Sequence, residues 1–449
     1  MDDFTAYMNR LDTQLAQYMP QPNTPLYDAI VKPRDLFRVP LKEAEPIQFS
    51  CIKQAFVHNY NNSQFYQKFC KERNISPDNI KTNDDLAKIP LIPDRFFKDY
   101  PVGKDFALWL ANIYTGELPN ISIPQKNPSY DDVLRAYYKA GITVSYSSGT
   151  SGRYTFIPRN RQTFLNAEYT LAKTLVGMAY PLWKYDSYGY LMMPHPKKNF
   201  IFAGRALEVY FDAVKDVQVA IDREVTTELV QITMGRRKGL KSDLIRYLSY
   251  RQNKKTIDRI ITWLERHEKT DDVITLLGAP YILYAVMERL KEEGRTFDFS
   301  GRSGVATGGG WKGLTTITPN DFRTEVQKNL GIDLVLDVYS MVEGNGWMIH
   351  CPEGHYLHVP YTYYKALVLD KEFKPVGYNE WGRFAFLDGV ATSHPSFIIT
   401  GDQVKLHDHC PVCDRPGPVL EPEVKRAQGE DLRGCAEEVR RMLSSDMAK

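Results

Sequence analysis

The spacing of apolar residues changes character along the chain. Up to about residue 95, apolar side chains recur at helical intervals, as in "LKEAEPIQFSCIKQAFVHNYNNSQFYQKFCKER". Between 142 and about 340, short β-type runs such as "ITVSY" and "SYGYLMMP" alternate with longer amphipathic stretches such as "RQTFLNAEYTLAKTLVGMAYPL". Strands that alternate with helices predict a parallel or mixed sheet covered by helices.

From residue 355 to 405 the pattern becomes β-rich, in "HYLHVPYTYYKALVLD", "GRFAFLD" and "SFIITGDQVKLHD". This predicts a smaller, mostly antiparallel unit. We therefore expect an α/β protein with four segments: a helical N-terminal segment over residues 1–95, an α/β core over 96–345, a β-rich subdomain over 346–420 and a short charged tail over 421–449.

Composition narrows the class of protein without naming a function. The 449 residues exceed one typical domain, and 43% hydrophobic with 25% charged residues is ordinary for a globular protein. A net charge of +2 gives no argument for nucleic acid as a partner. The N-terminus is polar and unlike a signal peptide, and no apolar run is long enough to span a bilayer. We expect a cytoplasmic protein.

The stretch "VSYSSGTSGRYTF" places four hydroxyl side chains and two glycines directly after a predicted strand. Glycine lets backbone N–H groups approach a polyphosphate closely, and hydroxyl groups donate to phosphate oxygens. The usual P-loop ends in Gly-Lys-Ser/Thr, whereas Arg153 follows the last glycine here. Taken alone, the pattern fits a surface loop equally well. The candidate phosphate ligands are Ser147, Ser148, Gly149, Thr150, Ser151 and Gly152.

Three further motifs follow in order: "GGGW" at 308–311, "YSMVE" at 339–343 and "TGD" at 400–402. Together with "SSGTSG" they resemble the adenylate-forming enzymes, the superfamily of acyl-CoA synthetases, luciferases and peptide-synthetase adenylation domains. Alone, "TGD" in a β-rich stretch would usually be a hairpin turn. The resemblance implies the fold of the large N-terminal domain of these enzymes, and it implies ATP and Mg²⁺ as cofactors.

The resemblance also implies a role for each motif. Gly308, Gly309 and Gly310 would border adenine, and Tyr339 would stack on it. Glu343 would bind Mg²⁺, and Asp402 would accept from the ribose hydroxyls. Arg426 stands where the family keeps a ribose- or phosphate-contacting arginine, although a solvated charge in a polar tail explains it equally well.

This sequence departs from the family pattern at several positions. Val342 replaces a threonine that donates to the α-phosphate, and Ser340 replaces a glycine. The lysine of the phosphate loop is absent, with Arg153 and Arg159 nearby. Lys312, after "GGGW", is a candidate electrostatic replacement.

A narrower resemblance extends over most of the chain. The segment "NNSQFYQKFCKERNISPDNIKTNDDLAKIPLIPDRFF" is similar to phenylacetate–CoA ligases and LuxE-type acyl-protein synthetases, and "GGGWKG" and "RAQGEDLRGC" resemble the latter. The chain stops about where such ligases begin a mobile C-terminal domain. The resemblance to LuxE-type proteins makes Cys435, in "RGCAEE", the acyl acceptor, whereas the residues alone suggest a free cysteine.

Cysteine and histidine residues cluster in two short segments, "CPEGHYLH" and "HDHCPVCDR". Their donor types and spacing favour structural Zn²⁺, and they resemble a zinc knuckle of phenylacetate–CoA ligase relatives. The alternative is a group of buried free thiols. The expected ligands are Cys351, His358, Cys410 and Cys413, with His355 as the substitute ligand. His195, after a predicted strand, either lines an acyl pocket or lies at the surface.

These features lead to one main functional hypothesis and two alternatives. A carboxylic acid, fatty or aryl, is activated as acyl-AMP and its acyl group passes to a thiol, first of all Cys435, and then to a partner such as an acyl reductase. The first alternative is a ligase that uses CoA or an acyl-carrier protein as the acceptor. The second is a non-catalytic binding subunit that contains zinc.

Overall fold

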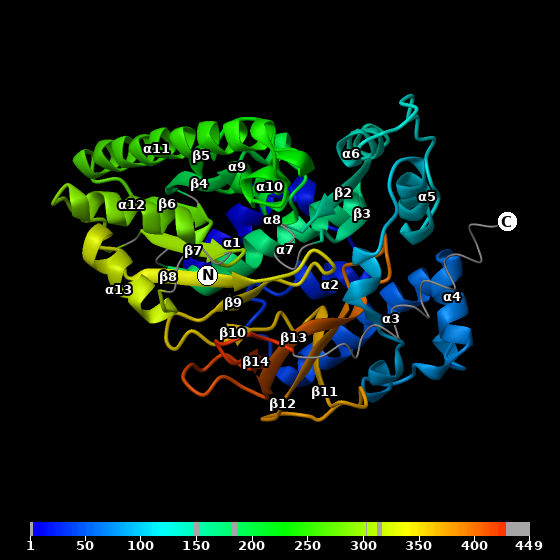
Figure 1. Ribbon diagram of the computed structural model, residues 1–449. Coiled ribbons are helices and arrows are strands. Elements are labelled where there is room, and N and C mark those ends of the chain that lie inside the picture. Colours follow the sequence, from blue (N-terminus) through cyan, green and yellow to red (C-terminus); the bar gives the residue numbers. More distant parts are fainter. Residues whose placement is uncertain (1–2, 148–152, 182–185, 302, 312–316, 428–449) are drawn as a thin grey trace. The chain divides into compact units, whose positions relative to one another are not determined.

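The computed structural model describes residues 3–147, 153–181, 186–301, 303–311 and 317–427 (Figure 1). Contacts within the chain separate two compact units, which we describe one at a time. The first comprises residues 1–15 and 179–339, and the second comprises residues 16–178 and 340–449. The finer division of the chain that we expect from the sequence stays a prediction.

The first unit is built on a parallel sheet, which confirms the α/β pattern. Its strands lie in the order β8-β7-β6-β4-β5, and every neighbouring pair is parallel. β5 was not expected, because most of its residues are not buried and its pattern resembles a loop. The strand bounds are β4 Tyr188–Pro194, β5 Lys215–Ile221, β6 Ile274–Gly278, β7 Gly304–Gly308 and β8 Leu334–Tyr339.

Helices cover this sheet through their apolar faces (Figure 1). Ile260, Leu283 and Val326, from three different helices, join the same buried cluster as Ile274 and Val305 from the strands. The last of the three helices begins at the Thr318 cap and ends at Gly331, whose φ of 67° suits glycine. The helices of the unit are α1 Asp3–Gln14, α8 Phe202–Ala206, α9 Tyr210–Ala213, α10 Thr227–Thr233, α11 Leu240–Lys269, α12 Pro280–Glu292 and α13 Pro319–Leu330.

The second unit begins with the helices expected near the N-terminus. Phe56 and Tyr66 pack against Phe397 at ring-centroid distances of 6.0 and 5.7 Å, which attaches this helical segment to the β-rich part of the same unit. Its helices are α2 Pro25–Ile30, α3 Leu41–Asn62, α4 Gln64–Lys71, α5 Lys104–Ile113, α6 Tyr130–Lys139 and α7 Arg161–Ala179.

The β-rich part of this unit is mostly antiparallel, as expected. The short β1 adds a parallel pairing and β15 an antiparallel pairing to β13. The bounds are β1 Ile92–Pro93, β9 Met348–His350, β10 Leu357–His358, β11 Tyr364–Leu369, β12 Trp381–Asp388, β13 Phe397–His407, β14 Val419–Leu420 and β15 Lys425–Arg426.

The "TGD" motif lies inside strand β13, so the reading of this motif as a hairpin turn is wrong. The register between β12 and β13 shifts here, and residues 400–402 lie opposite Phe384 alone. Thr400 Oγ1 donates to Phe384 O at 2.9 Å. Such an irregularity bends a strand locally and changes the direction of a side chain, in this case Asp402.

The hydroxyl-rich stretch connects two antiparallel strands, β2 Ile142–Tyr146 and β3 Phe156–Asn160. Residues 148–152 at its centre lie outside the described part of the chain. None of the described helices combines the length and the apolar character needed to cross a membrane.

Candidate active site and metal centre

The described ends of the phosphate-loop candidate are held together by hydrogen bonds. Ser147 N donates to Thr155 O at 3.1 Å, and Thr155 N donates to Ser147 Oγ at 3.0 Å. Tyr154 N donates to the Tyr100 hydroxyl at 3.2 Å, and Arg153 forms an ion pair with Asp99. The segment after β1 therefore fixes the base of this hairpin.

Glu343 is buried, with 5% of its surface exposed. A charged pair from the segment after β1, Asp94 and Lys98, lies near it. Asp94 and Lys98 are one helical turn apart, and Lys98 Nζ lies 2.5 Å from Asp94 Oδ2. Burial raises the pKa of Glu343, and Asp94 adds to this effect, whereas Lys98 and a hydrogen bond with Thr155 lower it. The site thus combines a buried carboxylate with an ammonium group that favours its charged form.

Lys98 keeps its own charge in this environment. Burial by itself would lower the pKa of its ammonium group, but Asp94 and Glu343 outweigh burial and raise it. A positive charge held in a site with little water interacts strongly with anions such as phosphate. Lys98 is therefore a functional candidate that the sequence reasoning missed, because it lies in a proline-rich connector with no recognisable motif.

Asp402 and Arg426 form an ion pair beside Asp94 and Lys98. Asp402 Oδ1 lies 2.7 Å from Arg426 Nη1, and the two residues face each other where β13 pairs with β15. The Asp402 side chain is 9% exposed, whereas that of Arg426 is 67% exposed. A Cβ atom on Gly401 would lie 3.7 Å from Asp94 Oδ2, which shows how close the "TGD" strand is to the Asp94–Lys98 pair.

A buried arginine holds the backbone on both sides of Glu343. Arg159 is fully buried, and its Nη2 donates to Val342 O at 2.6 Å and to Gly344 O at 3.0 Å. Its Nε donates to Asn345 Oδ1 at 2.8 Å. The sequence analysis regarded Arg159 only as a charge near the phosphate loop, whereas the structure shows that it supports the Glu343 segment.

The carbonyl of Glu343 itself is held by two further side chains. Ser396 Oγ donates to Glu343 O at 2.6 Å, and His394 Nε2 donates to the same oxygen at 2.9 Å. Burial lowers the pKa of His394 to about 3, so its ring is neutral. Asp388 Oδ2 accepts from Asn345 N at 2.6 Å and from its side chain at 2.9 Å. Three consecutive carbonyls, of residues 342 to 344, thus have buried donors.

In the first unit, the glycine turn and Tyr339 lie at the same edge of the sheet. β7 ends at Gly308, which pairs with Val338 of β8, and Tyr339 is the next residue. Gly309 and Gly310 have φ values of 79° and 67°, a conformation that favours glycine. The carboxyl ends of neighbouring parallel strands are a common place for ligand binding. Lys312 lies outside the described residues.

His195 has a local structural role. Its Nδ1 accepts from Lys197 N at 3.2 Å and caps a short helical turn after β4. Cys435 and residues 148–152 lie in parts of the chain that the structure does not describe. Of the nucleotide-site candidates that the structure describes in the second unit, Glu343, Asp402 and Arg426 gather around the Asp94–Lys98 pair.

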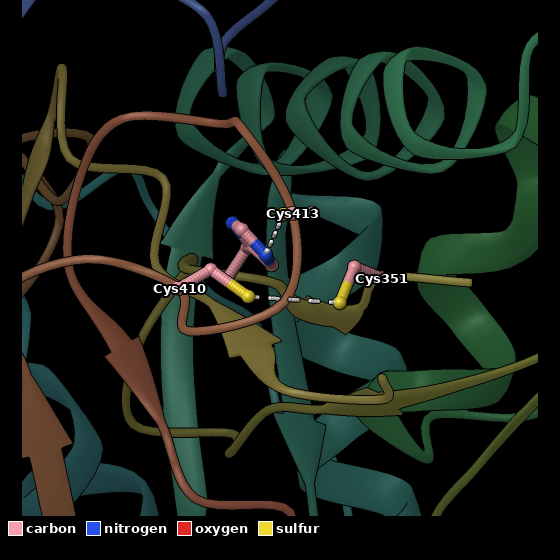
Figure 2. Close-up of side chains that lie close together, drawn as sticks. Cys351, Cys410 and Cys413 are labelled. Carbon is pink, nitrogen blue, oxygen red and sulfur yellow. Dashed lines mark hydrogen bonds between the residues drawn. The ribbon is translucent and has the colours of Figure 1, made fainter. Parts of the chain in front are cut away.

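The four expected metal ligands lie together in the second unit. Cys351, His358, Cys410 and Cys413 offer donor atoms that all lie within 4.8 Å of one another. Cys351 Sγ is 4.0 Å from Cys410 Sγ, and Cys413 Sγ is 3.4 Å from His358 Nε2 (Figure 2). His355 does not belong to this group.

This arrangement suits a tetrahedral ion. Zn–S bonds of about 2.3 Å place two tetrahedral sulfur ligands about 3.8 Å apart, close to the observed sulfur separation. Burial lowers the pKa of His358 to about 3, so its imidazole is neutral and can act as a ligand. Figure 2 shows Cys410 and Cys413 on one loop, facing Cys351 on another. Arg415 joins these two loops through Glu353, at 2.9 Å.

Comparison with known proteins finds similarity to the LuxE family. The model of the acyl-protein synthetase family LuxE matches residues 251–444. Two relatives, the long-chain-fatty-acid–luciferin-component ligases of Vibrio harveyi and Aliivibrio fischeri, are each 23% identical over 401 residues, which cover 88% of this chain and 88% of theirs. This chain is similar to LuxE-type acyl-protein synthetases, and LuxE-like denotes this similarity.

Solved structures assign the fold of this LuxE-like protein. An open conformation of 2-hydroxyisobutyryl-CoA ligase, in complex with 2-HIB-AMP and CoA, has a TM-score of 0.59 at 14% identity and covers 91% of this chain and 74% of that one. The thioesterification state of the same ligase also gives 0.59, at 13% identity. The LuxE-like protein has the fold of the adenylate-forming enzymes, which confirms the fold class expected from its motifs.

Proposed function

We propose that this LuxE-like protein uses Mg·ATP to activate a carboxylic acid as an acyl-adenylate and then transfers the acyl group to a thiol. The observation that carries the first step is the group formed by Glu343, Lys98 and Asp402 beside the phosphate-loop hairpin. Its support is the LuxE family match over residues 251–444 together with the adenylate-forming fold.

In the first step, an oxygen of the substrate carboxylate attacks the α-phosphorus of ATP. A new P–O bond forms, the bond to the β-phosphate oxygen breaks, and pyrophosphate leaves with the electron pair. The hydroxyls of Ser147 and the loop that follows donate to phosphate oxygens, and the Lys98 ammonium stabilises their negative charge. Asp402 accepts from the ribose hydroxyls, and Tyr339 with the glycine turn at 308–310 holds the base.

The residues present fit Mg²⁺, because Glu343 supplies a hard carboxylate oxygen, and the nearby Lys98 partly offsets the rise in its pKa that burial causes. When bound, Mg²⁺ neutralises charge on the phosphates. The hydrogen bonds from Arg159, Ser396 and His394 fix the backbone of Glu343, so that its carboxylate has little freedom to move away. We therefore assign Arg159 a positioning role.

In the second step, the thiolate of Cys435 attacks the acyl carbonyl of the adenylate. A C–S bond forms, the C–O bond to AMP breaks, and AMP leaves with the electron pair, while the thiol proton passes to solvent. The acyl group then passes to a partner such as an acyl reductase.

The acid that we propose as the substrate is a long-chain fatty acid. Its support is the name of the two relatives, which are long-chain-fatty-acid–luciferin-component ligases with 88% coverage of both chains. An aryl acid is the main alternative, so the assay must include both classes.

The role of the Cys351, His358, Cys410 and Cys413 group in this proposal is structural. We propose Zn²⁺ as its ion, since three thiols and one imidazole are typical ligands of closed structural zinc sites. Cys410 and Cys413 follow β13, the strand that carries Asp402. The ion would fix one end of β13, and Asp402 at the centre of this strand is the residue that we propose to bind the ribose.

ATP–pyrophosphate exchange that depends on added carboxylic acid tests the first step directly. We expect exchange with long-chain fatty acids and a loss of at least a hundredfold in Glu343→Gln, because this variant keeps the size of the side chain and removes its charge. Glu372→Gln, at an exposed position of the same unit, is the matched control. Absence of exchange with every fatty and aryl acid would contradict the proposal and favour a binding subunit.

A further inference from the structure

The two halves of helix α11, the long helix along the outside of the first unit, have opposite arrangements of apolar side chains (Figure 1). The C-terminal half buries Ile260, Trp263 and Leu264, as a helix packed on a sheet should. In the N-terminal half, the buried residues are small and polar, and the large apolar residues other than the half-buried Ile245 are exposed. The buried residues of this half are Ser242, Ser249 and Thr256.

Three of the exposed apolar residues form a line on the outer side of the helix, and two more flank it. Ser242, Ser249 and Thr256 are each seven residues apart, so they lie on one stripe that faces the protein. With a turn of about 100° per residue, Leu240, Leu244 and Tyr247 lie on the opposite side. The exposed fractions are 90% for Leu240, 58% for Leu244, 57% for Tyr247, 50% for Leu248 and 62% for Tyr250.

Basic residues surround this line. Residues 236 to 255 contain eight lysines and arginines and a single acidic residue, Asp243, whereas the whole chain has a net charge of only +2. The rest of the chain is therefore net negative. Arg237 pairs with Glu228 and Arg246 with Asp243, but no described carboxylate pairs with Lys238, Lys241, Arg251, Lys254 or Lys255.

Helix stability does not explain this charge. The N-terminus of a helix carries a partial positive charge, so Lys238 and Lys241 at the start of α11 are unfavourably placed. The helix also begins at Gly239 without a side-chain cap. Exposed leucines beside unpaired cations are instead the pattern of a surface that binds an anionic partner with an apolar interior.

We propose that the N-terminal half of α11 binds the surface of an anionic phospholipid membrane. We define the α11 surface as Leu240, Leu244, Tyr247, Leu248, Arg251, Lys254 and Lys255. Its apolar residues enter the boundary between headgroups and acyl chains, while Arg251, Lys254 and Lys255, further along the outer side, contact lipid phosphates. The cations are spread over several turns, which suits mobile headgroups better than one fixed set of carboxylates.

Flotation of the full chain with lipid vesicles tests this proposal. Vesicles of phosphatidylcholine and phosphatidylglycerol in equal parts should bind the chain, and vesicles of phosphatidylcholine alone should not. The triple variant Arg251→Gln, Lys254→Gln and Lys255→Gln should lower the partition constant about a hundredfold, since each basic residue near an anionic surface contributes about one tenfold step or slightly less. Raised salt should weaken binding of the unmodified chain.

A second variant, Leu240→Ser with Leu244→Ser, separates the apolar contribution from the electrostatic one and should also lower vesicle binding at least tenfold. Matched controls are Leu108→Ser, whose leucine is 56% exposed on α5, and the triple Lys42→Gln, Lys104→Gln and Lys371→Gln at exposed positions of the second unit. Both controls should bind vesicles like the unmodified chain. Retained pyrophosphate exchange shows that each variant is folded.

Two results would overturn the proposal. One is a chain that does not float with anionic vesicles, and the other is vesicle binding that the α11 variants leave unchanged. A third result would assign the α11 surface to an acidic protein partner instead. In this case the chain does not bind anionic vesicles, and immobilised polyglutamate retains the unmodified chain but not the triple charge variant.

Discussion

At the scale of single residues, the proposed chemistry depends on opposite charges in a site that is largely closed to water. Glu343 is buried near Lys98 and Asp94, and the charges of these two groups act on its pKa in opposite directions. Burial alone would favour a neutral carboxyl group at Glu343, which binds Mg²⁺ poorly. The ammonium of Lys98 opposes this effect in part, although the pKa of Glu343 remains raised.

The first prediction concerns the charge of Lys98. Lys98→Met should lower pyrophosphate exchange about a hundredfold, because a fixed cation near the phosphates is lost. The variant also removes a group that lowers the pKa of Glu343, so this carboxylate should become protonated at a higher pH. The acid limb of kcat/KM for Mg·ATP should therefore move to higher pH.

Lys104→Met, at an exposed position on α5, is the control and should leave both quantities unchanged. A slower Lys98→Met variant whose acid limb does not move would show that Lys98 does not act on Glu343.

The second prediction assigns Asp402 to the ribose. Asp402→Asn should raise KM for ATP about tenfold to a hundredfold with a smaller effect on kcat, as expected for loss of a charge-assisted hydrogen bond. The decisive measurement uses ATP analogues that lack one ribose hydroxyl. The unmodified protein should bind the analogue more weakly than ATP, whereas Asp402→Asn should bind the analogue and ATP with nearly equal affinity. Equal losses in both proteins would mean that Asp402 serves only its ion pair with Arg426.

At the scale of structural elements, the segment after β8 owes its shape to side chains from β3 and β13. The guanidinium of Arg159 on β3 donates to the carbonyls of residues 342 and 344, and Ser396 beside β13 donates to residue 343. Val342 takes part in this support through its backbone carbonyl.

The third prediction tests this support. Arg159→Lys keeps the charge, but one ammonium group cannot replace donors on three sides, so buried carbonyls lose partners. We expect the free energy of unfolding to fall by about 2–4 kcal/mol, measured by chemical denaturation. Arg161→Lys, an exposed arginine two residues later, should change it by less than about 0.5 kcal/mol. Similar stability in the two variants would contradict the role of Arg159.

The fourth prediction concerns the metal centre, where two hairpin loops meet. The purified protein should contain about one equivalent of zinc, and His358→Ala should lose it and melt at a lower temperature, because binding energy at such a site is folding energy. Metal analysis and thermal unfolding measure both effects. His355→Ala and His409→Ala should keep the metal, since neither residue belongs to the cluster. Zinc retained in His358→Ala would exclude this ligand set.

At the scale of the whole molecule, the two proposed half-reactions use different parts of the chain. Activation uses residues up to Arg426, whereas the proposed acceptor, Cys435, lies close to the last residue, Lys449. The steps should therefore be separable by substitution.

The fifth prediction follows from this separation. Cys435→Ser should retain pyrophosphate exchange and lose the label that a radioactive fatty acid leaves on the denatured protein. Cys70→Ser, at a buried position that belongs to neither proposed site, should retain the label. Label that persists in Cys435→Ser would identify another acceptor, and release of an acyl-CoA on addition of CoA would identify a CoA ligase.

The fold could be predicted from local patterns wherever an element carries its own signal. The helix α7 and the strands β2 and β4 are confirmed at the expected positions. By contrast, β1 and β15 have two residues each and exist only through their pairing with β13. β5 was missed because its mixed exposure gives no alternating pattern.

The sequence by itself determined the regular elements that carry their own periodic pattern, the donor types of the metal ligands and the motifs that point to an adenylate-forming fold, because these depend on residues close together in the chain. The tertiary structure decided which charged side chains lie close to one another. Lys98 reaches Glu343, and Arg159 reaches the carbonyls beside it, only because segments far apart in sequence are packed together. Burial and long-range electrostatics, which set the ionisation of these groups, come from that packing and leave no local pattern to read.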